Sequence, residues 1–199
     1  MDDDKHKRIL ILVGHPDPAE GRLCRALAQA YADGAHKAGH EVETIDLAQF
    51  DVPLLRSAHE WQTAPVPDAL APVQAALTRC EHLVIVFPLW MGDMPAMLKA
   101  FIEQVARPGW AFPKGAGGPM GPKALSGRSA RVVVTMGMPA LVYRYFFRAH
   151  SVKALERNIL GFIGFGPVRE TLFGNVEGAS GDTRAGWLAT MAKLGAQAR

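Results

Sequence analysis

Three short, continuous apolar runs constrain the fold of this chain more than any other feature of its sequence. They are residues 8–13 (RILILV), 82–87 (HLVIVF) and 130–135 (ARVVVT), and none of them alternates regularly between apolar and polar positions. Runs of this length are typical of strands that are buried on both faces, as in parallel sheets with crossover helices on each side. The chain is therefore predicted to be an α/β protein.

Helical periodicities separate these runs. Apolar residues at 23, 26, 27, 30 and 31 predict a helix over 23–38, which Gly39 closes as a C-cap. Further helices are expected at about 69–78, 95–105, within 142–160 and at 183–196, and further strands at 42–47 and 168–173. The stretches 48–67 and 108–129 are rich in Pro or Gly and are expected to be long connections. Five strands alternating with helices favour a flavodoxin-like three-layer sandwich with a parallel sheet in the order 2-1-3-4-5.

The length and the ends of the sequence suggest a simple organisation. A chain of 199 residues suits one domain, predicted over residues 8–199. Residues 1–7 (MDDDKHK) are expected to be a disordered or vector-derived N-terminus, as the Asp-Asp-Asp-Lys run suggests. They lack the apolar stretch of a secretory signal, so no such signal is expected. No apolar run approaches the roughly 18 residues that a membrane span needs, so no membrane insertion is expected.

Charge and cysteine content narrow the possible partners and compartment. The net charge is +3 and the pI about 9.0, but the basic residues are scattered and no nucleic-acid-binding signature is present. Small anionic ligands such as phosphates are therefore more economical partners than nucleic acid. Cys24 and Cys80 stand in no metal-ligand spacing and are interpreted as core thiols, which suits a cytoplasmic location.

The predicted strand order also locates a ligand site. In that order the first and third strands are neighbours, and the chain leaves them in opposite directions. Ligands of open α/β sheets bind at such a switch point, outside the carboxyl ends of the strands. The unusual stretches 14–22, 88–94 and 136–141 all follow strands at this edge, so we expect them to converge on one site.

The first of these stretches, GHPDPAEGR, runs into the amino end of a helix, which is a favourable place for a phosphate. His15 can donate a hydrogen bond there, and Arg22 can add a charge-assisted one. The chain has neither G-x-G-x-x-G nor a Walker A sequence. The alternative is a proline-rich turn in which Asp17 or Glu20 caps the helix. The pair of His15 and Asp17 is too small to indicate a metal site, and no metal is expected.

The second stretch combines large apolar side chains with a loop. Backbone amides of residues 89–92 can border a planar heterocycle, with Trp90 or Met91 packed beside it. The alternative is that both side chains pack against a partner subunit or a long loop.

The third stretch, residues 135–139, offers the Thr135 hydroxyl and a close backbone approach at Gly137, or is an ordinary Gly-Pro turn. Beyond it, Tyr143 and His150 can reach a bound ring as proton donors. In the alternative interpretation, both are structural residues of an apolar helix.

Two motifs carry a resemblance to a known family. The segment F-P-L-x-x-x-x-x-P-A-x-L-K at 87–99, together with GHPDP at 14–18, resembles the flavodoxin-like NAD(P)H:quinone oxidoreductases over residues 8–175. This family includes quinone reductases, modulator-of-drug-activity proteins and ancillary subunits of potassium efflux systems. The resemblance implies a cytoplasmic homodimer that binds FMN or FAD. It further implies that hydride passes from NAD(P)H through the flavin to quinones or similar acceptors in a ping-pong cycle.

The resemblance also implies roles for individual residues. By position, the flavin phosphate is lined by His15, Asp17, Gly21, Arg22, Leu23 and Cys24, the isoalloxazine by Pro88, Leu89, Trp90, Met91 and Gly92, and its polar edge by Thr135, Met136, Gly137 and Met138. Tyr143 and His150 match the catalytic Tyr and His of the family loosely and would stabilise charge on the reduced flavin. Trp110 and Phe112, within the aromatic stretch 109–112, would reach the substrate pocket of a neighbouring subunit.

The sequence departs from the family in its phosphate loop. Ala19, Glu20 and Gly21, together with Cys24, stand where many relatives carry a serine that is often followed by Asn. Glu20 would repel a phosphate unless it turns outward or pairs with Arg22. The chain also lacks the C-terminal extension of the mammalian enzymes, which favours FMN, with FAD as the alternative.

Two other functions remain open from the sequence. The first is a flavin-binding regulatory subunit that associates peripherally with a membrane transporter and has incidental reductase activity. The second is a one-electron carrier of the flavodoxin type, which the basic charge of the chain disfavours because such carriers are typically acidic.

Overall fold

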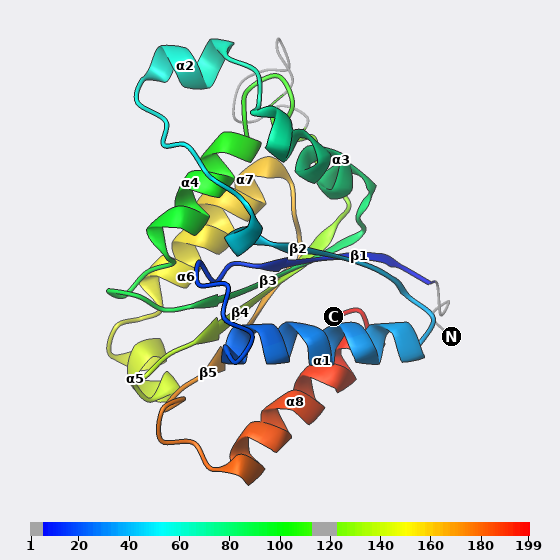
Figure 1. Cartoon of the computed structure of the whole chain (residues 1–199), viewed down its shortest axis with the longest axis vertical. Coiled ribbons are helices and arrows are strands. Elements are labelled where there is room, and N and C mark those ends of the chain that lie inside the picture. Colours follow the sequence, from blue (N-terminus) through cyan, green and yellow to red (C-terminus); the bar gives the residue numbers. More distant parts are fainter. Residues whose placement is uncertain (1–5, 113–122) are drawn as a thin grey trace.

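A five-stranded parallel sheet forms the centre of the computed structural model, which describes residues 6–112 and 123–199 (Figure 1). The strands are β1 (Arg8–Val13), β2 (Glu41–Asp46), β3 (His82–Pro88), β4 (Ser129–Thr135) and β5 (Val168–Phe173), in the order β2-β1-β3-β4-β5. All neighbouring strands are parallel. The predicted flavodoxin-like architecture and strand order are confirmed.

Two helices cover one face of the sheet. They are α1 (Leu23–Lys37) and α8 (Gly181–Ala196), which lie side by side below the sheet in Figure 1. A Cβ atom added at Gly34 would lie 1.9 Å from the carbonyl oxygen of Ala192, and one at Gly195 would lie 2.0 Å from that of Tyr31. The two helices therefore touch backbone to backbone, and side chains longer than hydrogen do not fit at these positions.

The opposite face carries α3 (Ala71–Arg79), α4 (Ala96–Val105) and the chain of short helices before β5. Along β1, Ile9 and Ile11 pack toward α1, whereas Leu10 and Leu12 pack toward α3 and α4. The strand runs do not alternate between apolar and polar residues because both faces of the central strands are buried, as predicted.

Most helices lie close to their predicted positions. The helix predicted at 69–78 begins with a 3-10 turn, η2 (Asp68–Leu70), and continues as α3, and Gly39 adopts the positive φ of 85° expected of a C-cap glycine. The connection 48–67 contains a further 3-10 turn, η1 (Leu47–Gln49), and the helix α2 (Ala58–Thr63). This helix has no buried residue and extends away from the sheet (Figure 1).

The region 142–160 differs from a simple helix. It divides into α5 (Ala140–Tyr145), α6 (His150–Ala154), the π-helical segment η4 (Leu155–Leu160) and α7 (Gly161–Ile163). Arg148 and Ala149 have positive φ angles of 54° and 48°, which break the helix between α5 and α6. Across residues 6–112 and 123–199, no helix is long and apolar enough to cross a membrane.

Candidate active site

Three loops meet at the carboxyl ends of β1, β3 and β4. Main-chain hydrogen bonds continue one residue beyond the strands: the Gly14 amide donates to the Val86 carbonyl at 2.7 Å, and the Leu89 amide donates to the Thr135 carbonyl at 2.8 Å. The sheet thereby aligns the stretches 14–22, 88–94 and 136–141 side by side. We call this edge the rim.

The first loop is held by a network of side chains. His15 is buried, and its Nδ1 atom accepts a hydrogen bond from the Asp17 amide at 3.1 Å. Asp17 in turn accepts from the Ala19 amide at 2.8 Å and forms an ion pair with Arg22. Because Nδ1 of His15 is an acceptor, the neutral imidazole carries its proton on Nε2. Burial and the neighbouring Arg22 lower the pKa of His15, so the ring is a neutral N–H donor at pH 7.

A second arginine anchors this loop to the sheet. Arg25, in the first turn of α1, forms an ion pair with Asp46 at the end of β2 and donates to the Asp17 carbonyl at 2.9 Å. Both side chains of the pair are largely buried. Arg25 therefore fixes the position of the loop that follows β1 relative to the end of β2.

The amino end of α1 has unused donors. Helix α1 has no side-chain cap and no acidic residue in its first turn, and Glu20 is exposed, so the alternative in which Asp17 or Glu20 caps the helix is wrong. Within the described part of the chain, the amides of Leu23 and Cys24 have no acceptor. Together with the helix dipole and Arg22, these donors make the end of α1 suitable for an anion.

The side chains of Cys24 and Thr135 contact each other at the amino end of α1. The Cys24 thiol lies 3.3 Å from the Thr135 hydroxyl, and both residues are buried. Burial raises the pKa of Cys24 to about 11, so the thiol stays protonated and unreactive at neutral pH. A ligand on the rim can therefore use the Cys24 amide but not its sulfur.

The second loop is a tight hairpin at the end of β3. The Trp90 amide donates to the Asp93 carbonyl at 2.8 Å and the Asp93 amide returns a bond to Trp90 at 3.0 Å, while Met91 and Gly92 have positive φ angles of 49° and 82°. Positive φ at both central positions defines a type I′ turn, which a glycine at the second position favours. The amides of Leu89 and Trp90 are thus already bonded, whereas those of Met91 and Gly92 have no acceptor among the described residues.

This turn exposes two large apolar side chains. Met91 is fully exposed and Trp90 is 47 % exposed. The Trp90 indole meets the His15 ring edge to face, with 5.6 Å between the ring centroids. Trp90 therefore bridges the first and second loops, and it borders the end of α1 that can hold an anion.

The third loop is more enclosed. Met136 is buried, and its carbonyl accepts from the Val176 amide at 3.2 Å. The Met138 carbonyl accepts from the Asn175 amide at 3.1 Å, whereas Gly137 is exposed between them. Gly137 and the half-buried side chain of Met138 are therefore the parts of this loop that a ligand can contact.

The two predicted proton donors have different surroundings. Tyr143 is 2 % exposed, and its hydroxyl lies 2.6 Å from the Ser151 hydroxyl, which ties α5 to α6. His150, the first residue of α6, is exposed. Tyr145, which the sequence did not single out, exposes 72 % of its surface. Residues two apart on a helix face different sides, so an apolar pattern alone does not tell which tyrosine faces inward.

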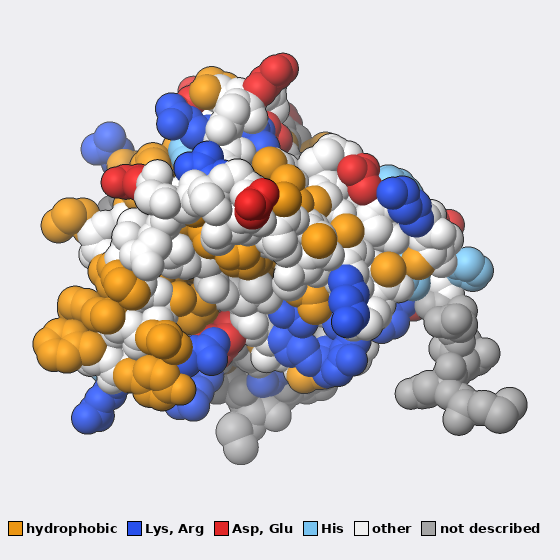
Figure 2. Space-filling model, turned by 90° about the horizontal axis from the view of Figure 1, so that it is seen from below, with side chains coloured by type: hydrophobic (Ala, Val, Ile, Leu, Met, Phe, Trp, Pro, Cys, Tyr) orange, Lys and Arg blue, Asp and Glu red, His pale blue; other side chains and the backbone are white. Residues whose placement is uncertain are grey.

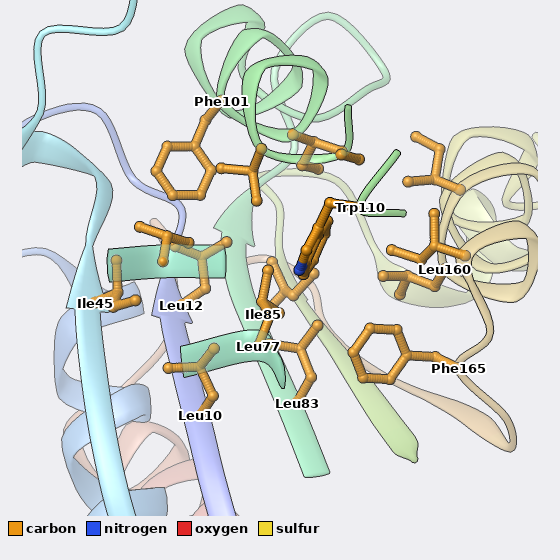
Figure 3. Close-up of a pocket in the computed structure, with 16 residues that line it drawn as sticks. Leu10, Leu12, Ile45, Leu77, Leu83, Ile85, Phe101, Trp110, Leu160 and Phe165 are labelled. Carbon is orange, nitrogen blue, oxygen red and sulfur yellow. The ribbon is translucent and has the colours of Figure 1, made fainter. Parts of the chain in front are cut away.

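The two aromatic residues predicted to reach a neighbouring subunit also differ. The Trp110 indole donates to the Thr78 hydroxyl at 3.2 Å and lines an apolar cavity of about 40 Å³ beside Leu10 and Leu83 (Figure 3). These leucines lie near the amino ends of their strands, so Trp110 is not part of the rim of its own chain. Phe112 packs on Phe162 and borders a separate groove of about 530 Å³.

Comparison with known proteins identifies the family. A family model described as a flavodoxin-like fold matches residues 7–194, and the chain belongs to this family. The "FMN-dependent NADH:quinone oxidoreductase 3" of Bacillus anthracis is 29 % identical to it over 86 % of this chain and 87 % of the relative. The resemblance drawn from the sequence motifs is confirmed.

Solved structures agree in fold. The Smu.1420 protein of Streptococcus mutans UA159 superposes with a TM-score of 0.80 and 26 % identity, over 96 % of this chain and 99 % of that one. An NAD(P)H:quinone oxidoreductase from Methanothermobacter marburgensis gives a TM-score of 0.81 at 21 % identity, over 97 % of both chains. At that identity the second likeness shows the fold alone.

Proposed function

We propose that this protein is an FMN-dependent NAD(P)H oxidoreductase that reduces quinones or similar small acceptors. The observation that carries the proposal is the combination, on one rim, of an anion-binding helix end with an exposed aromatic and thioether pair. The first part suits a phosphate and the second suits a planar ring. The name of the Bacillus anthracis relative supports the choice of FMN, NADH and quinone.

The residues present at the end of α1 fit the phosphate of FMN. The Leu23 and Cys24 amides are available, Nε2 of His15 carries a proton, and the charge of Arg22 lies beside them. Glu20, the residue that would repel a phosphate, is exposed to solvent, which screens its charge. Asp17 acts on the ligand indirectly, because its carboxylate holds Arg22 and the loop.

The second and third loops fit the ring of the cofactor. Trp90 and Met91 offer apolar surface at one side, and the amides of Met91, Gly92 and Gly137 offer hydrogen-bond donors at its edge. When bound, FMN supplies the chemistry of accepting a hydride from the nicotinamide and passing it to the acceptor. The chain holds and orients the ring and leaves one face for the two substrates, which use it in turn.

Two residues near the rim, His150 and Tyr143, are proposed to take part in proton donation to the reduced ring or the acceptor. We propose that the exposed His150 imidazole serves as proton donor or charge partner for the reduced ring and acceptor. Tyr143 is proposed to act through its hydrogen bond to Ser151, which positions the beginning of α6 and therefore His150.

A flavin titration tests the proposal. Purified protein should quench FMN fluorescence on binding, and excess NADH or NADPH should bleach the bound flavin under anaerobic conditions. A quinone added afterwards should restore the flavin absorbance. Folded protein that takes up no FMN would overturn the assignment.

Riboflavin provides a matched ligand without the phosphate. If the end of α1 holds the phosphate, FMN should bind at least about tenfold more tightly than riboflavin, since charge-assisted hydrogen bonds contribute about 1.5–3 kcal/mol. The His15→Gln substitution should narrow this ratio and leave riboflavin affinity unchanged. Equal affinity of the wild type for both ligands would show that the phosphate binds elsewhere.

The quaternary structure and cellular location are also part of the proposal. We infer a cytoplasmic homodimer, in which Phe112 is better placed than Trp110 to contact a second copy, because it borders the open groove. Light scattering of the FMN-loaded protein should give twice the mass of the chain. The comparisons give no support to a transporter subunit, and that alternative is not proposed.

A further inference from the structure

Two apolar features of the described residues lie outside the three loops of the rim. One is on the surface, where Figure 2 shows hydrophobic side chains gathered at the end of the molecule at which Figure 1 places α5. These side chains lie beside the rim and are open to the second copy of the proposed homodimer. The other is a cavity inside the chain, and no second copy is needed to complete it, because all of its walls belong to one chain.

The cavity lies between the sheet and the helical layer opposite α1 and α8. Strands β1 and β3 line one side, segments α3, α4 and η4 line the other, and the volume is about 40 Å³ (Figure 3). Every lining residue is apolar, and the one nitrogen among their side chains, Nε1 of Trp110, already donates to the Thr78 hydroxyl. The cavity therefore offers a guest van der Waals contacts but no hydrogen bond.

The wall of the cavity has an inner and an outer side. On the inner side, Leu10, Leu83 and Ile85 project from β1 and β3 and expose at most 3 % of their surface. On the outer side, Leu77 and Trp110 are only partly buried. Leu77 is fixed in α3, whereas Trp110 lies in the turn that follows α4. A guest can therefore enter by rotation of the Trp110 side chain.

Two local features border the open space. Ala106, at the end of α4, is the smallest residue of the wall. Ile159 and Leu160 belong to the π-helical segment η4, and this rare geometry occurs frequently at functional sites. Protein interiors leave few voids larger than a water molecule, so the cavity is a defined feature of this fold.

The size and the chemistry of the cavity select its guest. A volume of about 10–15 Å³ is enough for one water molecule, but water needs about two to four polar partners, and this cavity provides none. Benzene fits an apolar cavity of about 150 Å³, so an aromatic ring is too large for this one. What remains is a single apolar molecule that is larger than water and smaller than benzene.

We propose that the cavity is a binding site for one small apolar molecule of gas size, a class for which xenon is the probe. Binding gains dispersion contacts for side chains that otherwise face empty space. None of the residues in the rim loops 14–22, 88–94 and 136–141 lines the cavity. The guest therefore does not compete with FMN, and the inference does not rest on the proposed function.

NMR of the tryptophan indole N–H groups under xenon pressure tests the proposal in the FMN-loaded full chain. The signal of Trp110 should shift and saturate as the pressure rises, because its indole lines the cavity. The signals of Trp90 on the rim and Trp187 on α8 should stay in place. The same response is expected without FMN, so a failure of the chain to bind flavin would leave this inference intact.

Substitutions in the wall change the space in both directions. Val73→Ile adds a methyl group from α3 and should weaken xenon binding at least about tenfold, because the added atoms occupy the space of the guest. Ala106→Val fills the same space from the end of α4 and replaces Val73→Ile should that variant not fold. Leu77→Ala enlarges the cavity and should admit benzene, which the wild type should not bind. Leu188→Ala, at a partly buried leucine of α8, is the matched control and should bind both ligands like the wild type.

Three results would overturn the proposal. One is a Trp110 signal that does not respond to xenon in the wild type, even if Leu77→Ala responds. Another is a response that Val73→Ile and Ala106→Val, both folded, leave unchanged. The third is a shift of Trp61 without a shift of Trp110, because Trp61 borders the separate groove of about 530 Å³ and xenon would then lie outside the cavity.

Discussion

The two edges of the central sheet use similar residues in opposite ways. At the amino edge, His82 is fully buried, shares a hydrogen bond with Ser129 at 2.7 Å and stacks with Tyr31. At the carboxyl edge, His15 is also buried, but it keeps an N–H donor beside free amides and an exposed tryptophan. The amino edge encloses its polar groups in protein and leaves Nε2 of His82 without a partner among the described residues, whereas the carboxyl edge keeps hydrogen-bond donors open to a ligand.

The largest expected effect is a loss of stability at acidic pH that comes from His82 at the amino edge. Burial lowers the pKa of His82 to about 3, while an unfolded histidine titrates near 6.5. The unfolded chain therefore binds this proton first, and stability falls as the pH drops from 6.5 toward 3. Between pH 6.5 and pH 4 this residue should account for a loss of about 3 kcal/mol.

Urea unfolding at pH 7 and pH 4 measures this loss. The His82→Asn variant keeps a polar group near Ser129 but does not titrate, so its stability should depend less steeply on pH. A His36→Asn variant, at an exposed histidine of α1, should keep the wild-type slope. If the His82 variant also keeps that slope, the histidine is not protected from protons as the structure implies.

The next largest effect is a loss of FMN affinity and stability when the first loop at the carboxyl edge loses its anchor, Arg25. Arg25→Ala removes the link between Asp46, the Asp17 carbonyl and the first loop, and leaves Asp46 largely buried without its partner. FMN affinity should fall more than tenfold and stability by about 1–3 kcal/mol, the cost of leaving a buried polar group unpaired. Isothermal titration and urea unfolding measure the two quantities. Arg22→Ala, whose ion pair is more exposed, should weaken FMN binding with little change in stability.

A smaller effect is expected in the second loop. Trp90→Ala should weaken FMN and riboflavin binding equally, by about threefold to tenfold, because an aromatic contact contributes about 0.5–1.5 kcal/mol. Met91→Ala removes a fully exposed side chain and should leave the unfolding free energy unchanged. A preferential loss of FMN over riboflavin in Trp90→Ala would mean that the indole acts on His15 and the phosphate rather than on the ring.

The smallest effect distinguishes positioning from direct catalysis. Tyr143→Phe loses the hydrogen bond to Ser151 and should cost about 1 kcal/mol of stability. The rate of flavin reduction should change only a few-fold, with an unchanged pH profile, because the phenol is enclosed by protein. His150→Asn should lower the rate of acceptor reduction more than Tyr143→Phe does. A hundredfold loss in Tyr143→Phe would show that its hydroxyl reaches the reacting ring.

The sequence predicted the sheet and the meeting of the three loops at its carboxyl edge because both depend on local patterns. Uninterrupted apolar runs specify strands buried on both faces, and the strand order then brings the three loops together. The orientation of single side chains depends on tertiary contacts instead. The enclosure of Tyr143, the exposure of Tyr145 and the use of the Leu89 amide by Thr135 all depend on packing between distant segments.

The interruption after α5 illustrates the same limit. The sequence predicted a helical segment within 142–160, and no glycine or proline between these positions indicates a break. The break comes from two non-glycine residues with positive φ, Arg148 and Ala149, a conformation that tertiary contacts must stabilise. The exposure of Phe146 and Phe147, directly before this break, was therefore not predicted.

The close contact between α1 and α8 links the carboxyl-terminal helix to the ligand. The helix whose amino end is proposed to hold the FMN phosphate is the same one whose backbone lies against Ala192 and Gly195 with no space for a methyl group. Any opening of α8 therefore loosens the support of the cofactor site. Bound FMN should in turn slow amide hydrogen exchange in α8, a helix outside the proposed site, and flavin release should report early unfolding of the carboxyl-terminal segment.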